Sequence, residues 1–400
     1  KTKTDETLVA STYEKTFYPS LGYRLLAGAK IWGIIHYFFA YKELMSGDWD
    51  KMLPDHLNSL AGAKDSLEYN LAVYKMYRNI EDGHGFISSP TMGDYFGRAS
   101  APCSVKFVEG QAIVSVFRDD SIAQKAGLSI GDVVLEINGE KTEIRAQRLA
   151  ALLNASNEWT RSEYVSWRLL RGKEGENITL KVRDKKNREK TVVLPLSQKY
   201  PFKSARDQLD TVRILPGNIG YVDLARLVGD DVDNMFEKLK DTRAIIFDMR
   251  GYPNGTAWSI APRLTEKSNT AAARFMRYNP MSPDIGFRDM NSMSTTHTFV
   301  QHIPANMGKS VYKGKTVMLI DESTQSQAEH TGLFFEAANG TEFIGSPTAG
   351  ANGDVTNFNP HDRWLMGLLR ARADCVLMGD ATLAIERDHL WTAQHIAPGD

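Results

Sequence analysis

The strongest candidate for chemistry is a serine that lies between an apolar run and a helical pattern. Residues 317–320 are apolar, a polar stretch ends at Ser326, and apolar residues recur at helical spacing over residues 327–338. A hydroxyl at that position lies at the electropositive start of a helix, where backbone N–H groups can stabilise an oxyanion. This arrangement suits a nucleophile. Serine is also a preferred N-cap residue, and Ser326 taken alone is better explained as a cap.

Composition narrows the classes of function. The 48 Lys and Arg against 49 Asp and Glu give a net charge of -1, so no global field favours nucleic acid or an anionic membrane. Cys103 and Cys375 show no spacing typical of a zinc site or a disulfide framework. No phosphate-binding glycine loop, HExxH helix or carboxylate cluster occurs. We therefore expect no nucleic-acid partner, no metal and no cofactor.

The elements that must position Ser326 fall into three parts. Residues 20–79 have helical periodicity, and the apolar segment 25–41 within them is too short, with Lys30 and His36, to predict a membrane span. Short β-branched runs separated by turns follow, and after residue 219 strands alternate with helical stretches. We expect strands at 105–108, 113–117, 133–137, 165–170, 178–182, 191–194, 219–224, 244–249 and 317–320, and helices near 231–240 and 327–338.

Residues 121–139 carry the first specific motif. Ser-Ile-Ala-Gln-Lys-Ala-Gly-Leu leads into Gly-Asp, an apolar strand and Ile-Asn-Gly-Glu. Gly127 can end a helix with a positive φ, and Asn138-Gly139 favours a primed hairpin turn. This order resembles a PDZ domain over residues 101–197, which implies capture of an extended peptide by strand addition. The glycine-rich loop that binds a peptide carboxylate in that family is replaced by Arg-Ala-Ser-Ala-Pro-Cys at 98–103.

Three further segments extend the resemblance. They are Gly-Tyr-Val-Asp at 220–223, Ala-Ile-Ile-Phe-Asp-Met-Arg-Gly at 244–251 and Ile-Gly-Ser-Pro-Thr-Ala-Gly at 344–350. With residues 321–330, and after a PDZ-like module, they resemble the S41 serine peptidases, which include the C-terminal processing (tail-specific) peptidases and the tricorn core. The likeness covers about residues 80–358. It implies an α/β multidomain protein whose catalytic domain has a ClpP/crotonase-like fold.

The resemblance also implies roles for particular residues. The family's nucleophile corresponds to Ser326, and its helix glutamate corresponds to Glu329, a possible supporting acid. The oxyanion donors correspond to the backbone N–H of Gln327 and to the glycine turn near Gly255. Such a pair of donors would stabilise the tetrahedral intermediate of acyl transfer.

The expected general base is His84. Processing peptidases use a lysine, but the corresponding position is Ala351, which cannot accept a proton. The tricorn-like branch has a histidine just before the PDZ-like module, where His84 lies, and an imidazole with a pKa of about 6.5 suits a base for serine. His330 is a rival, although it follows Ser326 by four residues on the same expected helix and is less suited to reach the hydroxyl.

The acidic partner of the base stays open between Asp82, Glu329 and Glu386. Residues 360–400 depart from the closing strands of S41 domains, and we interpret the change as a hypothetical reading-frame shift in the gene. If that is so, the third catalytic group is missing and activity is impaired.

Two functions are consistent with these observations. The first is a serine endopeptidase acting on peptides or unfolded proteins, and the alternative is a catalytically inactive protein that binds a peptide or another ligand on the same scaffold.

The expected domains are a helical region contributing His84 (1–100), a PDZ-like domain (101–197) and an S41-like domain (198–400). The resemblance suggests a periplasmic, cell-surface or secreted protein whose signal has been removed. Oligomeric state and cleavage preference are not readable. Asn154, Asn177 and Asn339 each begin a sequon.

Overall fold

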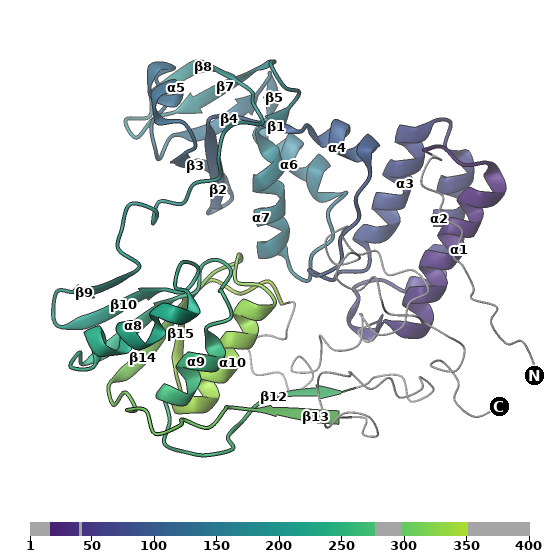
Figure 1. Ribbon diagram of the computed structural model, residues 1–400. Helices are drawn as coiled ribbons and strands as arrows, with labels where there is room; N and C mark the ends of the chain where they lie inside the picture. The colour runs from purple at the N-terminus through teal and green to yellow at the C-terminus, as the bar shows by residue number, and fades with distance from the viewer. Residues whose placement is uncertain (1–16, 40–41, 277–297, 351–400) are drawn as a thin grey trace, which may run out of the picture.

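The computed structural model describes residues 17–39, 42–276 and 298–350. Within them the chain forms a helical region, a β-rich module and an α/β layer, in sequence order (Figure 1). The expected α/β multidomain class is confirmed. Ala351, Glu386 and the atypical residues 360–400 lie outside the described residues.

The N-terminal region is helical because capped starts precede its apolar periodic segments. The Asp48 carboxylate accepts hydrogen bonds from two N–H groups of the next helix, and Asp65 accepts one from Glu68. Trp49, Leu60 and Met76 are buried in the core of this region. Each helix in the described part of the chain is too short or too polar to cross a membrane. The elements are α1 (Leu21–Phe38), η1 (Lys42–Leu44), α2 (Trp49–Gly62), α3 (Ser66–Arg78) and α4 (Pro90–Phe96).

The middle module is an antiparallel sheet whose strands follow the order β2-β3-β4-β7-β8, with β5 paired to β4. Asn138 and Gly139 have φ values of 52° and 80°, and Gly127 has a φ of 83° after α5, as the expected turns require. The elements are β1 (Ala99–Ser100), β2 (Cys103–Val108), β3 (Gln111–Phe117), α5 (Asp120–Lys125), β4 (Val133–Ile137), β5 (Glu140–Lys141), α6 (Thr142–Ala150), α7 (Glu158–Leu169), β6 (Arg171–Gly172), β7 (Asn177–Arg183) and β8 (Glu189–Pro195).

The strand expected at residues 165–170 is wrong, because this segment belongs to helix α7 and its C-terminal end. Asn157 caps α7 by accepting a hydrogen bond from the Thr160 N–H, and Val165 and Leu169 are buried one helical turn apart. A segment as short as residues 165–170 fits both a helical and a strand period, so the N-cap and the buried face decide that it is helical.

The C-terminal module is a sheet with the order β15-β14-β11-β10-β9, in which only the edge strand β9 is antiparallel to its neighbour. Its expected strands and helices are confirmed. A separate hairpin pairs β12 with β13. The elements are β9 (Val212–Leu215), β10 (Ile219–Asp223), η2 (Gly229–Asp231), α8 (Val232–Leu239), β11 (Ala244–Asp248), α9 (Ala257–Ile260), η3 (Ala261–Arg263), β12 (Ala271–Met276), β13 (Thr298–His302), β14 (Lys315–Ile320), α10 (Gln327–Asn339) and β15 (Glu342–Gly345).

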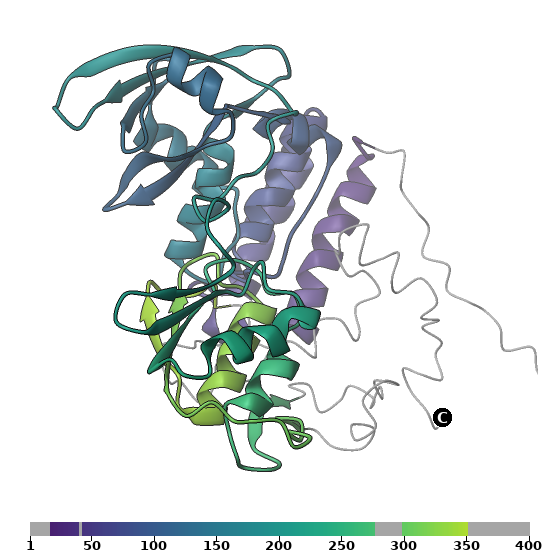
Figure 2. The same ribbon diagram turned by 60° about the vertical axis from the view of Figure 1, so that its left-hand side comes forward.

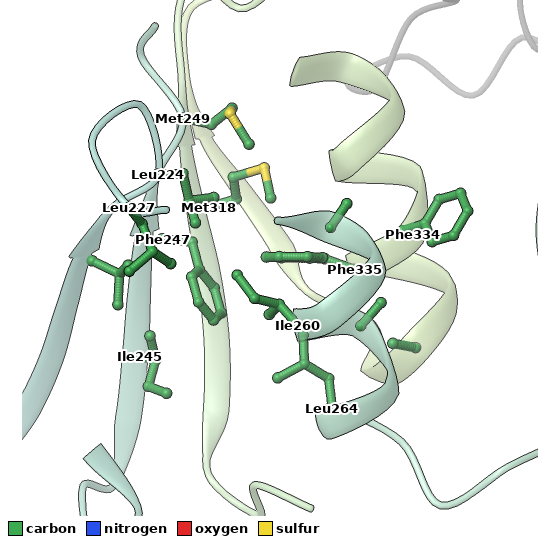
Figure 3. Close-up of a cluster of buried hydrophobic side chains, with 14 of the residues drawn as sticks. Leu224, Leu227, Ile245, Phe247, Met249, Ile260, Leu264, Met318, Phe334 and Phe335 are labelled. Atoms are coloured by element: carbon green, nitrogen blue, oxygen red, sulfur yellow. The ribbon is translucent and has the colours of Figure 1, made fainter. Parts of the chain in front are cut away.

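Buried hydrophobic side chains pack α9 and α10 against this sheet (Figure 3). Phe247 on β11 and Phe335 on α10 meet edge to face with ring centroids 4.8 Å apart, and Met318 on β14 is fully buried beside them. Burying each such side chain contributes about 1.5–3 kcal/mol. The start of α10 is therefore held at the end of β14, where Ser326 lies.

Candidate active site

Ser326 lies at the junction between β14 and α10 in an unusual backbone conformation. Its φ is 58° and its ψ is -115°, a region that L-residues other than glycine rarely adopt. The preceding turn is anchored by Thr324, whose hydroxyl donates to the Met249 carbonyl over 3.0 Å. Ordinary N-cap residues have extended dihedral angles, so capping alone does not account for this conformation. A strained serine between a strand and a helix is typical of exposed nucleophiles.

Glu329 holds the backbone of Ser326 in place. Its carboxylate accepts a hydrogen bond from the Ser326 N–H over 2.9 Å, which is the backward bond of a capping box. The same buried carboxylate accepts bonds from the Thr348 hydroxyl and the Gly350 N–H, both over 2.7 Å. Glu329 thus joins the turn that carries Ser326 to the turn that follows β15.

The glycine turn at Gly255 and the first residue of α10, which carry the expected oxyanion donors, lie close together. Gly255 has a φ of 71°, and a Cβ atom added there would lie 3.8 Å from the side-chain nitrogen of Gln327. Asn254 fixes the glycine turn by donating to the carbonyls of Ala225 and Leu227, each over 3.1 Å. The turn after β11 therefore lies against the first residue of α10, as an oxyanion site requires.

A buried charge network supports the start of this glycine turn. The fully buried Asp248 carboxylate accepts hydrogen bonds from the Arg250 guanidinium over 2.7 and 3.0 Å and from the Tyr221 hydroxyl over 2.5 Å. Arg206 forms an ion pair with it over 2.8 Å. Burial by itself raises the pKa of Asp248, but the bonds from Arg250 and Tyr221 and the Arg206 charge outweigh it and lower the pKa to about 2.

Replacing Asp248 by Asn is expected to destabilise the fold by about 1.5–3 kcal/mol, because the buried side chain loses its charge-assisted hydrogen bonds with Arg250 and its ion pair with Arg206. A lowered pKa in the folded state stabilises the protein above the unfolded value of 3.8, and this stabilisation is lost as the pH falls towards 2. Urea unfolding of wild type and Asp248→Asn at several acidic pH values measures both effects, with the exposed Asp241→Asn as control. An unchanged stability of Asp248→Asn at neutral pH would contradict the prediction.

The loop that carries His84 is in direct contact with the turn that carries Ser326. The Gly83 carbonyl accepts a hydrogen bond from the Gln325 side chain over 2.7 Å, across 242 residues of sequence. The Tyr164 hydroxyl of α7 donates to the same carbonyl over 3.0 Å and to the Gln325 side-chain oxygen over 3.2 Å. The residues immediately before His84 and before Ser326 are therefore hydrogen-bonded partners.

The loop between α6 and α7 supports the His84 loop through hydrogen bonds. The sequence did not predict this support. The Asn154 side chain donates to the carbonyls of Asp82 and Gly85 over 2.6 and 2.7 Å, and the Ser156 hydroxyl accepts from the Gly83 N–H over 2.7 Å. Asn154 is buried, so its sequon is not accessible in the folded chain. The only sequence signal was the polar run Asn-Ala-Ser-Asn at 154–157, between two helical patterns.

Removing the Asn154 amide is expected to slow reaction of Ser326 with a fluorophosphonate by about 10–100-fold, because small misplacements of catalytic groups are costly. Asn154→Ala takes a donor from two carbonyls of the His84 loop without touching either candidate residue. The labelling rate and the melting temperature are measured together, with Asn70→Ala on α3 as the control. A labelling rate equal to that of the wild type would show that this support is dispensable.

The structure places two of the three candidate acids and the rival base. Asp82 is buried, which raises the pKa of its carboxyl, and its Oδ1 accepts the backbone N–H of His84 over 2.9 Å. Glu329 binds the backbone of Ser326, as described above. His330 faces away, since its Nε2 bonds to Gln301 over 2.6 Å and its ring packs on Trp258. Burial lowers the pKa of His330 to about 4.

The PDZ-like sheet contacts the turn before Ser326 through β2. Lys106 on β2 forms ion pairs with Asp321 over 3.1 Å and Glu322 over 3.3 Å. Within the described residues β2 is the edge strand of its sheet and pairs with β3, and helix α7 packs against β2. Figures 1 and 2 show β2 and α7 projecting from the β-rich module towards the α/β layer.

Comparisons with known proteins agree with this architecture. Residues 218–373 match the model of peptidase family S41, and residues 113–158 match that of the PDZ domain. The fold is similar to that of mature CPAF complexed with lactacystin, with a TM-score of 0.60 and 12% identity over 83% of this chain and 86% of that chain. A second structure of mature CPAF gives 0.60 and 11%, over 83% and 85%. No significant match to a curated protein was found.

The predicted resemblance is therefore confirmed: a PDZ domain precedes a peptidase domain of family S41. The combination implies binding of a peptide substrate.

Proposed function

We propose that this chain is a serine endopeptidase that hydrolyses peptide bonds in peptides or unfolded proteins, with Ser326 as nucleophile and His84 as general base. The observation that carries the proposal is the hydrogen bond between Gln325 and Gly83. It joins the two loops on which the candidate nucleophile and base lie, although they are far apart in sequence. The unusual dihedral angles of Ser326 support the same assignment.

The proposed reaction follows the chemistry of other serine peptidases. The Ser326 hydroxyl attacks the scissile carbonyl carbon while His84 accepts its proton. The backbone N–H groups of Gln327 and Gly255 stabilise the negative charge on the carbonyl oxygen. His84 then gives the proton to the leaving amine, and a water molecule activated in the same way releases the acyl product. An extended segment of the substrate is captured by strand addition in the PDZ-like module.

A second candidate function is peptide or ligand binding without catalysis. The state of Asp82 favours it, because burial raises the pKa of this carboxyl and so biases it towards the neutral form. A neutral acid stabilises an imidazolium poorly, and the protonated base forms during acylation. The two functions differ in whether a carboxylate other than Asp82 stabilises the protonated imidazole of His84.

Labelling of the full chain with a fluorophosphonate at about pH 8 tests the proposal, because only an activated serine reacts quickly. A stoichiometric adduct on the peptide that contains Ser326, found by mass spectrometry, supports the peptidase. Absence of any adduct under conditions that label a known serine protease overturns the proposal and favours the binding protein. The expected location outside the cytoplasm stays a prediction.

A further inference from the structure

A half-exposed tryptophan lies between the glycine turn and the helix that begins after Ser326. Trp258 is on α9, three residues after Gly255, and 40% of its surface is exposed. Its ring meets the fully buried Phe334 of α10 edge to face, with ring centroids 4.6 Å apart. One part of the indole is therefore fixed against the core of the α/β layer, and the rest is open to contact by another molecule.

The neighbours of Trp258 place it beside the candidate site. Its ring packs on His330 with ring centroids 5.9 Å apart, and His330 follows Ser326 by four residues. Such a spacing is about one turn of helix α10, or about 5–6 Å. Trp258 therefore lies about one turn beyond Gly255 along the chain and beside a residue one turn beyond Ser326.

The two rings that pack on Trp258 carry no charge at neutral pH. Phe334 is apolar, and burial lowers the pKa of His330 to about 4, so its imidazole is neutral there. The Nε2 atom of His330 is bonded to Gln301 over 2.6 Å. The exposed part of the indole thus offers apolar contact area, and aromatic rings of this kind often contribute much of the energy of binding.

Trp258 and the His84 loop meet different parts of the chain around Ser326. Gly83 of that loop bonds to Gln325, the residue before Ser326, whereas Trp258 packs on the helix that follows Ser326. In the proposed reaction the leaving amine receives its proton from His84 and so lies next to the His84 loop. The acyl half of the substrate then lies on the α10 side, and the side chain of the residue before the scissile bond faces Trp258.

We propose that Trp258 determines specificity by binding a large apolar side chain of the residue that supplies the scissile carbonyl. This inference rests on the proposed function and names the class of its substrate. Contact with the indole removes apolar substrate surface from water, so peptides with Phe or Leu before the cleaved bond are preferred over peptides with Ala there. Trp258 touches the substrate side chain and takes no part in proton transfer.

The test measures how quickly Ser326 reacts with three diphenyl phosphonate esters, which carry the side chain of Phe, Ala or Lys next to phosphorus. The Ser326 oxygen bonds to phosphorus and phenol leaves with the proton, so the varied side chain takes the place of the residue before the scissile bond. With the wild-type full chain, the Phe ester is expected to react about 10–100-fold faster than the Ala ester. Mass spectrometry follows each adduct over time.

Trp258→Ala is expected to reduce the ratio of the Phe rate to the Ala rate to about 3-fold or less. Trp258→Glu is expected to raise the ratio of the Lys rate to the Phe rate by about 10-fold or more, because a carboxylate replaces apolar area. A ring that only covered Phe334 would affect the melting temperature and slow all three esters equally.

The matched control is Trp167→Ala, which should leave both ratios unchanged. Trp167 has nearly the same exposure, 41%, but its indole N–H donates to Glu163 on α7. Melting curves confirm that each variant folds. Trp258→Leu, which keeps an apolar side chain over Phe334, replaces Trp258→Ala if the latter unfolds, and it should give an intermediate ratio.

Equal rates of the Phe and Ala esters with the wild type would overturn the inference, and so would a wild-type ratio in Trp258→Ala. It is also overturned if none of the three esters reacts while a simple fluorophosphonate labels Ser326. These results leave the proposed function in place. A chain that gives no adduct with the fluorophosphonate either contradicts the proposed function and, with it, this inference.

Discussion

Replacing Ser326 by alanine is expected to lower kcat/KM for hydrolysis of an unfolded protein such as casein on the order of 10⁶-fold. The reason is chemical, because alanine carries no oxygen that can form an acyl intermediate. The Glu329 contacts with Thr348 and Gly350 do not involve the hydroxyl, and loss of its capping bond at the start of α10 costs only about 1 kcal/mol. The fold should therefore be preserved while the reaction stops.

Release of peptides, followed by chromatography, measures this loss, and the fluorophosphonate adduct should disappear with it. Ser259→Ala is the matched control, since Ser259 is an exposed serine on α9, four residues after Gly255. It should retain the activity and the adduct of the wild type. An adduct that persists in Ser326→Ala would place the nucleophile elsewhere.

Replacing His84 by alanine is expected to lower kcat/KM by about 10⁴-fold, the upper part of the range for general acid–base catalysis. A base accepts a proton only when it is neutral, so wild-type kcat/KM should fall as the pH is lowered through the pKa of the free base. In His84→Ala that decline should be absent, because water or hydroxide must take the proton. Stopped assays across neutral and acidic pH measure both features.

Two other histidines make this test specific. His330→Gln removes the rival base, whose Nε2 bonds to Gln301 and whose pKa burial lowers to about 4, and we expect activity within a few-fold of the wild type. His56→Gln on α2 controls for the loss of any imidazole. If His330→Gln loses as much activity as His84→Ala, the assignment of the base is contradicted.

Much of the fold could be predicted because its signals are local. The strand β14, the polar turn and the helix α10 are readable from an apolar run, a break and a helical period. Gly127 and the Asn138-Gly139 pair mark turns whose positive φ values follow from residue type. The strand expected at 165–170 is wrong because the four apolar residues of this segment fit either a helical or a strand period, and the burial that decides between them comes from distant segments.

The candidate site could be predicted only in part. Ser326, His84, Gln327, Gly255 and Glu329 were named from the sequence, and the tertiary structure brings their loops together while their catalytic roles stay predictions. Asn154 and Tyr164, which hold the His84 loop, could not be named in this way. Their hydrogen bonds reach partners about seventy to eighty residues before them in the chain, and no periodicity encodes such a pairing.

By itself the sequence determined the order of the modules, the place of the serine between strand and helix, and the turn glycines, because each depends on residue type and near neighbours. Only the tertiary structure decided that Ser326 adopts a positive φ and that Gln325 meets Gly83. These features are set by packing between segments remote in sequence, and the free energy of such contacts exists only once the chain has folded.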